Sequence, residues 1–185
     1  MRKLVLAAVL MLFATNFATA QIPTVEREAL IALYNSTDGA NWSNNSNWLG
    51  AVGTECTWRG VSCSGGYVET LTLSSNQLSG SIPAELGNLS SLTYLSMSSN
   101  KLSGSIPPEL GNLSSLTLLH LGYNQLSGSI PPELGNMSSL GVLWLYQNRL
   151  SGSIPPELEN MSSLGNLNLR KNQLSGSIPP VLGNL

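Results

Sequence analysis

Apolar side chains recur through most of the chain with a period of 24 residues. In the period that begins at Leu95, Leu95 and Met97 alternate with serines, as in a short strand with one buried face. The later apolar positions follow at uneven intervals, separated by glycine and by Pro107 and Pro108, which lack N–H donors. We therefore expect each period to fold as a strand and a return segment that holds at most a single 3₁₀ turn.

Seven apolar positions in each period are candidates for the core. In one period they are Leu92, Leu95, Met97, Leu102, Ile106, Leu110 and Leu113. Burying seven such side chains contributes roughly 10–20 kcal/mol, whereas ordering the backbone costs roughly 1–2 kcal/mol for each residue. A single period is therefore unstable alone, and the sequence predicts a solenoid in which neighbouring repeats stabilise one another.

One asparagine also recurs in each period, and we expect its amide to be buried in a turn. Such an amide can bond the backbone of its own repeat and of the next one, which satisfies groups whose burial is otherwise unfavourable. The predicted structural asparagine ladder consists of Asn76, Asn100, Asn124, Asn148 and Asn172.

Residues 1–20 are typical of a secretory signal peptide. Arg2 and Lys3 precede an apolar run, and small residues at 18–20 form a cleavage site. The apolar run is shorter than the ~20 residues that span a bilayer, and no later segment is apolar enough for membrane insertion. We therefore expect an exported protein.

A helix over residues 24–34 is expected to follow the signal peptide. Thr24 is its expected N-cap, and Val25, Ala29 and Leu33 share its apolar face. This helix would open a cap that covers the apolar end of the first repeat.

The chain contains two cysteines, Cys56 and Cys63. In an exported chain a disulfide between them is the default expectation, and it would stabilise the fold by roughly 2–3 kcal/mol. The alternative is a redox or metal-binding pair, but no histidine or second cysteine pair lies nearby in the sequence to complete a metal site.

Composition narrows the class of protein. Of the 185 residues, 42% are hydrophobic, 10% are charged and 18 are glycines, which fits a turn-dense solenoid and excludes a disordered chain. The net charge is −2, and loss of the signal peptide with its two basic residues brings it to −4. Such a weakly acidic chain has no feature that favours nucleic acid or an acidic membrane surface as a partner.

The repeat pattern LxxLxLxxNxLSGxIPxxLGNLxx, carried five times, resembles the plant-type leucine-rich repeats of receptor-like and polygalacturonase-inhibitor-like proteins. The segment from Cys56 to Cys63 matches C-x-W-x-G-V-x-C, which resembles the N-terminal cap of that family. The resemblance implies an α/β solenoid, a right-handed arc with a parallel β-sheet on its concave side and an N-terminal helical cap. It also implies 3₁₀ turns and short second strands on the return side, the latter at Ser79–Pro83, Ser103–Pro107, Ser127–Pro131, Ser151–Pro155 and Ser175–Pro179.

We expect three parts: the signal peptide at 1–20, the cap at 21–67, and five 24-residue leucine-rich repeats at 68–185, truncated in a sixth. Residues 183–185 fall in the middle of a period and add no polar cap. An uncapped repeat leaves apolar surface and a strand edge open. We expect either a fragment with repeats missing, or an end covered by a partner or by end-to-end contact with a second copy.

No group of residues has the pattern of a catalytic or cofactor site. Catalysis needs an acid, base or nucleophile with an orienting partner, but the chain has one histidine and no Gly-x-Ser-x-Gly motif. Four glutamates share one column of the repeat, and the period alone explains them as a solvated row: Glu85, Glu109, Glu133 and Glu157. We therefore expect no enzyme, no catalytic residues, no cofactor and no metal ligands.

The positions between the buried strand residues face the concave side, and they vary between repeats. In the first two repeats they are mostly small, with Ser96 and Ser98 among them. In the later three they include aromatic and basic side chains, the types that dominate interface energies. The predicted ligand-binding residues are His120, Tyr123, Trp144, Tyr146, Gln147, Arg170 and Lys171.

These features favour a secreted or cell-surface, non-catalytic binding module. The resemblance implies a protein, peptide or glycan ligand on the concave face and a role in defence or signalling. One alternative is a surface-structural or adhesive protein that binds ice or polysaccharide through regular rows of polar side chains. Others are an inactive fragment of a longer receptor-like protein, and ordinary surface variation on decayed repeats, since scattered exposed apolar residues are common.

Overall fold

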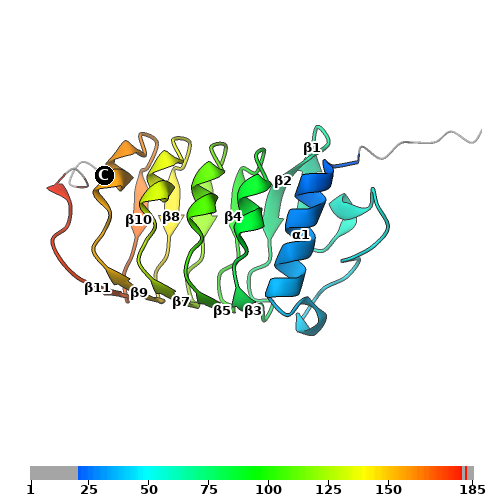
Figure 1. Cartoon of the computed structure of the whole chain (residues 1–185), viewed down its shortest axis with the longest axis horizontal. Coiled ribbons are helices and arrows are strands. Elements are labelled where there is room, and N and C mark those ends of the chain that lie inside the picture. The colour runs from blue at the N-terminus through cyan, green and yellow to red at the C-terminus, as the bar shows by residue number, and fades with distance from the viewer. Residues whose placement is uncertain (1–20, 181, 183–185) are drawn as a thin grey trace, which may run out of the picture.

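The computed structural model of the chain describes residues 21–180 and 182. The predicted signal peptide at 1–20 lies outside these residues and stays a prediction. The described part forms a row of coils that starts beside the helix α1, Thr24–Ser36, and continues to the strand β11, Gln173–Leu174 (Figure 1). The predicted solenoid is confirmed.

Each coil contributes one strand to a main sheet in the order β1-β2-β4-β6-β8-β10. The first pair, β1 and β2, is antiparallel, and the later pairs are parallel. The bounds are Val61–Ser64 (β1), Tyr67–Thr72 (β2), Tyr94–Ser96 (β4), Leu118–His120 (β6), Val142–Trp144 (β8) and Asn166–Asn168 (β10). Residues 24 apart are paired directly, so that Leu71, Leu95 and Leu119 form one row.

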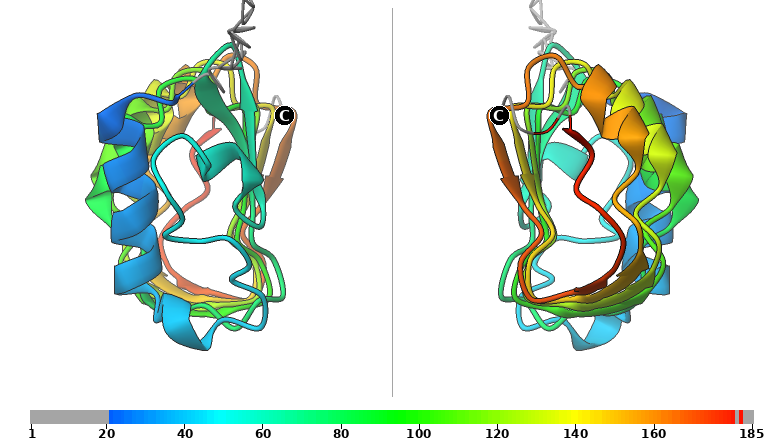
Figure 2. Two further views of the ribbon diagram at one scale, coloured as in Figure 1. Left: turned by 90° about the vertical axis from the view of Figure 1, so that its right-hand side faces the viewer. Right: turned by 90° about the vertical axis from the view of Figure 1, so that its left-hand side faces the viewer.

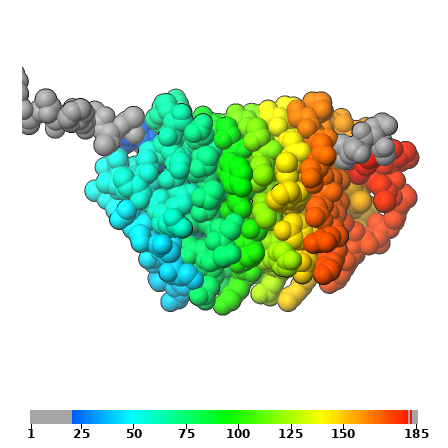
Figure 3. All heavy atoms as spheres, turned by 180° about the vertical axis from the view of Figure 1, so that it is seen from behind, coloured from blue at the N-terminus to red at the C-terminus, as the bar shows by residue number. Residues whose placement is uncertain are grey.

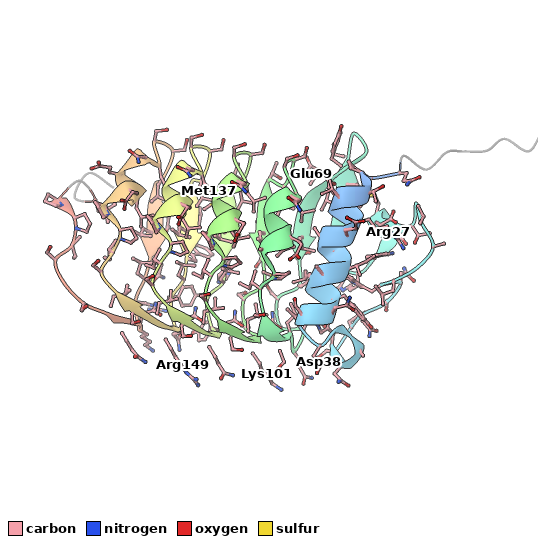
Figure 4. The ribbon with its side chains drawn as sticks, viewed as in Figure 1. Arg27, Asp38, Glu69, Lys101, Met137 and Arg149 are labelled. Carbon is pink, nitrogen blue, oxygen red and sulfur yellow. A yellow bond between two sulfur atoms is a disulfide. The ribbon has the colours of Figure 1, made fainter. Side chains whose placement is uncertain are left out.

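A second sheet runs along one flank of the coils in the order β11-β9-β7-β5-β3. Its strands are Ser79–Ser81 (β3), Lys101–Gly104 (β5), Gln125–Gly128 (β7), Arg149–Gly152 (β9) and Gln173–Leu174 (β11). From β5 onward they begin two residues earlier than predicted, because the Lys101 N–H already bonds the Leu78 carbonyl of the preceding coil at 2.8 Å. The side chains of Lys101 and Arg149 project along this flank (Figure 4).

The return segments hold the predicted 3₁₀ turns, which lie on the opposite side of the coils from the main sheet (Figure 2). The turns are η3 (Ala84–Asn88), η4 (Pro108–Asn112), η5 (Pro132–Asn136) and η6 (Pro156–Asn160). Gly111 allows η4 to approach η5, since a Cβ at this position would collide with the carbonyl oxygen of Glu133. Gly87 and Gly135 serve the same close approach in the neighbouring coils.

The interior between the sheets and the turns is filled by the apolar positions of the period. All seven candidate positions in the period around Leu95 are at most 1% exposed. Their side chains pack with those of the adjacent coils in one continuous core. The interior therefore has no boundary between one repeat and the next, as the instability of a single repeat requires.

The recurring asparagine lies between successive coils and bonds the backbone of both. The Asn100 side-chain oxygen accepts hydrogen bonds from the N–H groups of Asn76 (2.9 Å) and Leu78 (3.0 Å) in the preceding coil. Its amide nitrogen donates to the carbonyl oxygens of Leu73 and Met97, each at 2.9 Å. Each later rung likewise bonds its own coil and the one before: Asn124, Asn148 and Asn172.

The helix α1 packs beside η3, where it covers the first coil. It begins at Thr24 and runs two residues beyond the predicted end, to Ser36. The prediction that Thr24 caps the helix is wrong, because Thr24 is already helical and Pro23 occupies the cap position without a side-chain bond. None of the described helices is long and apolar enough to cross a membrane.

The buried face of α1 also differs from the prediction at one position. Val25 is 46% exposed, while Glu26 beside it is buried with Ala29 and Leu33. The Glu26 carboxylate accepts a hydrogen bond from the N–H of Val68 at 2.8 Å, and burial raises the pKa of this carboxyl. The Val68 N–H of the first coil thus needs a hydrogen-bond acceptor at position 26, where helical periodicity suggests a side chain exposed to solvent.

The remainder of the cap is held by a disulfide, an ion pair and three buried tryptophans. Cys56 and Cys63 are joined by a disulfide, with η2 (Glu55–Thr57) at one end of the loop and β1 at the other. Arg27 pairs with the buried Glu55. Trp42 directly follows η1 (Gly39–Asn41). Its ring centroid is 4.8 Å from that of Trp48, which in turn is 5.1 Å from that of Trp58.

Replacing Asn100 with alanine should destabilise the fold by about 3 kcal/mol, because it leaves several backbone groups between two coils without partners. The measurement is urea unfolding followed by circular dichroism. Asn112 is exposed on η4, and its replacement by alanine should change the free energy of unfolding by less than about 0.5 kcal/mol. Equal changes in the free energy of unfolding for the two substitutions would show that the asparagine ladder does not stabilise the fold.

Candidate functional site

Two of the seven predicted binding residues lie on strands of the three later coils, and the other five follow these strands by two or three residues. His120 ends β6 and Trp144 ends β8, each beside a fully buried leucine that points the other way. Successive coils form parallel bands on the face that Figure 3 presents, which lies behind the helical turns of Figure 1. We call the outward surface of the main sheet the sheet face.

Four rings on the sheet face form one group, and we call it the aromatic cluster: His120, Tyr123, Trp144 and Tyr146. The His120 ring meets the Trp144 ring edge-on, with centroids 4.9 Å apart. Its Nε2 lies 3.2 Å from the Tyr146 hydroxyl, within hydrogen-bond distance. Tyr123 meets Tyr146 edge-on from the other side at 5.2 Å. Tyr146 is therefore the centre of the cluster.

Two neighbours fix the position of the Tyr146 ring. The Arg170 guanidinium carbon lies 5.4 Å from its centroid, a cation–π contact from the next coil. On the other side, Gly122 leaves room for the ring, because a Cβ there would come within 2.8 Å of Tyr146 Cε1. Sequence reasoning missed Gly122, although it was a visible signal as the one glycine in a column whose other members are Ser74, Ser98, Tyr146 and Arg170.

The cluster is only partly covered and offers polar groups as well as ring faces. Tyr123 is 45% exposed, and Trp144 and Tyr146 are half-buried. Trp144 Nε1 donates to the Asn166 side-chain oxygen at 2.8 Å, which adds a residue that the sequence did not single out. Burial lowers the pKa of His120, so that its imidazole is neutral at pH 7 and can accept or donate one hydrogen bond.

The other two predicted residues are not part of this cluster by any ring or side-chain hydrogen bond among residues 21–180 and 182. Lys171 is exposed at the edge of the fifth coil. Gln147 is half-buried, and its side-chain oxygen is covered without a hydrogen-bond partner within the described residues. Both have positive φ, 53° for Gln147 and 55° for Lys171, as does Tyr123 at the same position of its coil.

The serines of the second coil face outward as predicted, but solvent hardly reaches them. Ser96 and Ser98 lie on the sheet face but are only 5% and 6% exposed. The Ser74 hydroxyl lies between them, 2.8 Å from the Ser96 hydroxyl and 3.0 Å from that of Ser98. These short side chains make a low, closed surface, which we call the serine floor, beside the taller aromatic cluster.

The glutamate column lies away from the sheet face. Glu85, Glu109, Glu133 and Glu157 are exposed on the 3₁₀ turns, one in each coil. Because successive coils stack regularly, each glutamate is separated from the next by the spacing between neighbouring turns. The arrangement is a solvated row and does not converge on one point.

Family models match both the N-terminal cap and the repeats. Residues 23–64 match the model of the leucine rich repeat N-terminal domain. Residues 66–126, 139–161 and 163–185 match models of the leucine rich repeat. The matched segments together cover most of the chain, with a gap at residues 127–138.

Solved structures show the same architecture. The BIR2 ectodomain from Arabidopsis thaliana is 38% identical, with a TM-score of 0.76, over 87% of this chain and 86% of its own. The structure of PEPR1 with AtPEP1 matches at 34% identity and a TM-score of 0.82, over 88% of this chain and 23% of that chain. This chain therefore spans about a quarter of the matched PEPR1–AtPEP1 chain. A plant ice-binding protein matches at 26% identity and a TM-score of 0.63, over 89% of this chain and 61% of its own.

Removing the Tyr146 ring should raise the pKa of His120 towards the ordinary value, because the imidazole would regain water and its charged form would be less disfavoured. His120 is the only histidine of the chain, so its ring protons give a single titrating signal in proton NMR spectra. The comparison is Tyr146→Ala against Tyr67→Ala, which alters an exposed tyrosine on β2. An unchanged His120 pKa in Tyr146→Ala would show that Tyr146 does not cover the imidazole.

Proposed function

The chain belongs to the leucine-rich repeat family, and we propose that it is a secreted, non-catalytic binding module whose ligand is a peptide or a protein segment. The ligand would lie on the sheet face, across the aromatic cluster and Arg170. The observation that carries this proposal is the direct contact among these side chains on three adjacent coils.

Aromatic and arginine side chains are the types whose truncation most often weakens protein interfaces. Here they gather in coils three to five, whereas the equivalent positions of the first coil carry small residues such as Thr72 and Ser74. Their mutual contacts hold the rings in place before a ligand arrives, which reduces the side-chain entropy lost on binding. A patch that is aromatic, partly exposed and held in place in this way suits recognition of apolar and polar groups together.

Secretion is supported by the predicted signal peptide and by the Cys56–Cys63 disulfide, since disulfides persist in oxidising compartments. Similarity to the BIR2 ectodomain and to the PEPR1–AtPEP1 structure supports ligand recognition outside the cell. A part in defence or signalling belongs to the same proposal. Because the match covers only 23% of the PEPR1–AtPEP1 chain, we do not extend the role of that larger protein to this chain.

Adhesion to ice or polysaccharide is the second candidate, and two observations favour it. One is the similarity to a plant ice-binding protein. The other is the second sheet, where β3 and β5 expose the serines Ser79, Ser81 and Ser103. Lys101 and Arg149 weigh against it, because their long charged side chains leave the same strands and interrupt the flat serine surface (Figure 4).

We expect Trp144→Ala to weaken peptide binding about thirtyfold, a loss of about 2 kcal/mol that is typical of a central aromatic residue. Peptides are first selected on the wild-type chain from a random 12-residue phage-displayed library, and the dissociation constant of the best synthetic peptide is then measured by calorimetry. The matched control is Arg149→Ala on the flank, which should leave the affinity unchanged. Equal affinities for wild type and Trp144→Ala, with both folded by circular dichroism, would overturn the proposal.

Under the leading proposal the purified chain should show no thermal hysteresis in a nanolitre osmometer, because Lys101 and Arg149 break the regular hydroxyl lattice of the flank. A double substitution of both residues by serine removes the two charged side chains from the flank and serves as the comparison. Hysteresis in the wild-type chain would favour the second candidate.

A further inference from the structure

A polar hollow of about 130 Å³ opens where the cap meets the first coil, at the end of the sheet face. Most of its lining residues carry a hydroxyl, an amide or a positive charge, and they include Arg59, Ser43, Asn44, Thr72, Ser74 and Ser75. A water molecule occupies about 30 Å³ in the liquid, so the hollow has room for a carboxylate group together with a water molecule or two.

The backbone of Arg59 is fixed beside this hollow. Its N–H donates to the Ser46 carbonyl at 3.0 Å, and its own carbonyl accepts from Nε1 of the buried Trp48 at 2.9 Å. The next residue, Gly60, has a φ of 84° and lies so close to β2 that a Cβ would collide with the Thr72 carbonyl. The loop closed by the disulfide therefore holds Gly60, with Arg59 before it, against β2.

The Arg59 guanidinium has no carboxylate partner within the described residues, where the sole ion pair joins Arg27 to Glu55. It is exposed, while the glutamate column lies on the other side of the coils. Of the other acidic side chains near the cap, Glu28 lies on α1, and Asp38 and Glu69 lie at opposite edges of the molecule (Figure 4). A guanidinium beside hydroxyl and amide donors favours an anion, and its planar fork matches a carboxylate.

The serine floor connects this hollow to the aromatic cluster. Thr72 on β2 pairs with Ser96 on β4, and Ser96 pairs with His120 on β6. Ser96 and Ser98 have short side chains that are nearly buried, so neither projects outward into this path. Two strand spacings of about 4.8 Å separate β2 from β6, and three residues of an extended peptide span this distance of about 10 Å.

We propose that Arg59 and the hollow beside it form an anion subsite for a carboxylate of the ligand, and that the ligand is an acidic peptide. The inference rests on the proposed function, since it extends the site at the aromatic cluster. It places an aspartate or glutamate about three residues from the side chain that the cluster binds. No outward position on the path between Arg59 and Arg170 carries an acidic residue that would repel such a ligand.

The test uses the peptides selected on the wild-type chain and the variant Arg59→Gln, which removes the charge from a side chain that makes no ion pair within residues 21–180 and 182. We expect the selected peptides to share an acidic residue three or four positions from an aromatic or large apolar one. Replacing that residue by its amide should weaken binding to the wild-type chain about tenfold, but should not change binding to Arg59→Gln. Arg149→Gln is the matched control, and it should retain the full preference for the acid.

Three results of this peptide experiment would overturn the inference. They are a selected pool without acidic residues, equal affinity for the acid and amide peptides, and a preference for the acid that survives in Arg59→Gln. Each of these leaves the proposed function standing provided that Trp144→Ala still weakens binding, so the two failures are distinguishable. Arg59-dependent retention of oligogalacturonate by a chain that selects no acidic peptide would also overturn it, because the anion would then be a sugar acid.

Discussion

The backbone hydrogen bonds between successive coils are the interaction on which the whole structure depends. From β4 onward each coil offers a strand of only three residues to the main sheet, and its neighbours must pair with it. The turn after the strand would leave N–H groups such as those of Asn76 and Leu78 unpaired, and the Asn100 amide satisfies both. Because an unsatisfied buried group is costly, the repeat can vary at its outward positions but not at this one.

This constraint separates positions that build the coil from positions that are free to change. Parallel pairing places residues 24 apart side by side, at about the strand spacing, so that large residues on adjacent coils must touch. Ring centroids 4.9 and 5.2 Å apart in the aromatic cluster are the direct result. Gly122 completes the arrangement, since only a residue without a Cβ leaves Tyr146 room to lie over its neighbour. The binding properties of the sheet face therefore depend on the outward side chains that differ from one repeat to the next.

The cap obeys different rules, because it ends a periodic structure with an aperiodic one. The antiparallel strand β1 covers the edge of β2 that would otherwise be open to pairing. Asn44 exchanges hydrogen bonds with Asn76, so the cap takes the place of a preceding coil in the ladder. Glu26 performs a similar task for the N–H of Val68, at the expense of burying a carboxyl group. These contacts also bring Arg59 to the end of the sheet face, next to the first strand.

Most of the solenoid was predictable because the period is regular. Seven apolar positions, one asparagine and two prolines per period account for the core, the ladder and the 3₁₀ turns, and the outward columns that hold Trp144 and Tyr146 follow from alternation about Leu143. The order of strands followed as well, since each coil can pair only with the next one. Repetition makes these local and nearest-neighbour properties, which a sequence pattern expresses directly.

Only the tertiary structure decided the features that depend on how unlike segments meet. Periodicity placed Val25 on the buried face of α1, but the docking of the helix on the first coil turns Glu26 inward instead. Alternation exposed Ser96 and Ser98, yet their neighbours close over them. Nothing in the spacing of the chain connects Arg59 with Thr72, which meet because the cap folds back on β2. Such contacts are set by the packing of surfaces that do not repeat, and a periodic pattern carries no information about them.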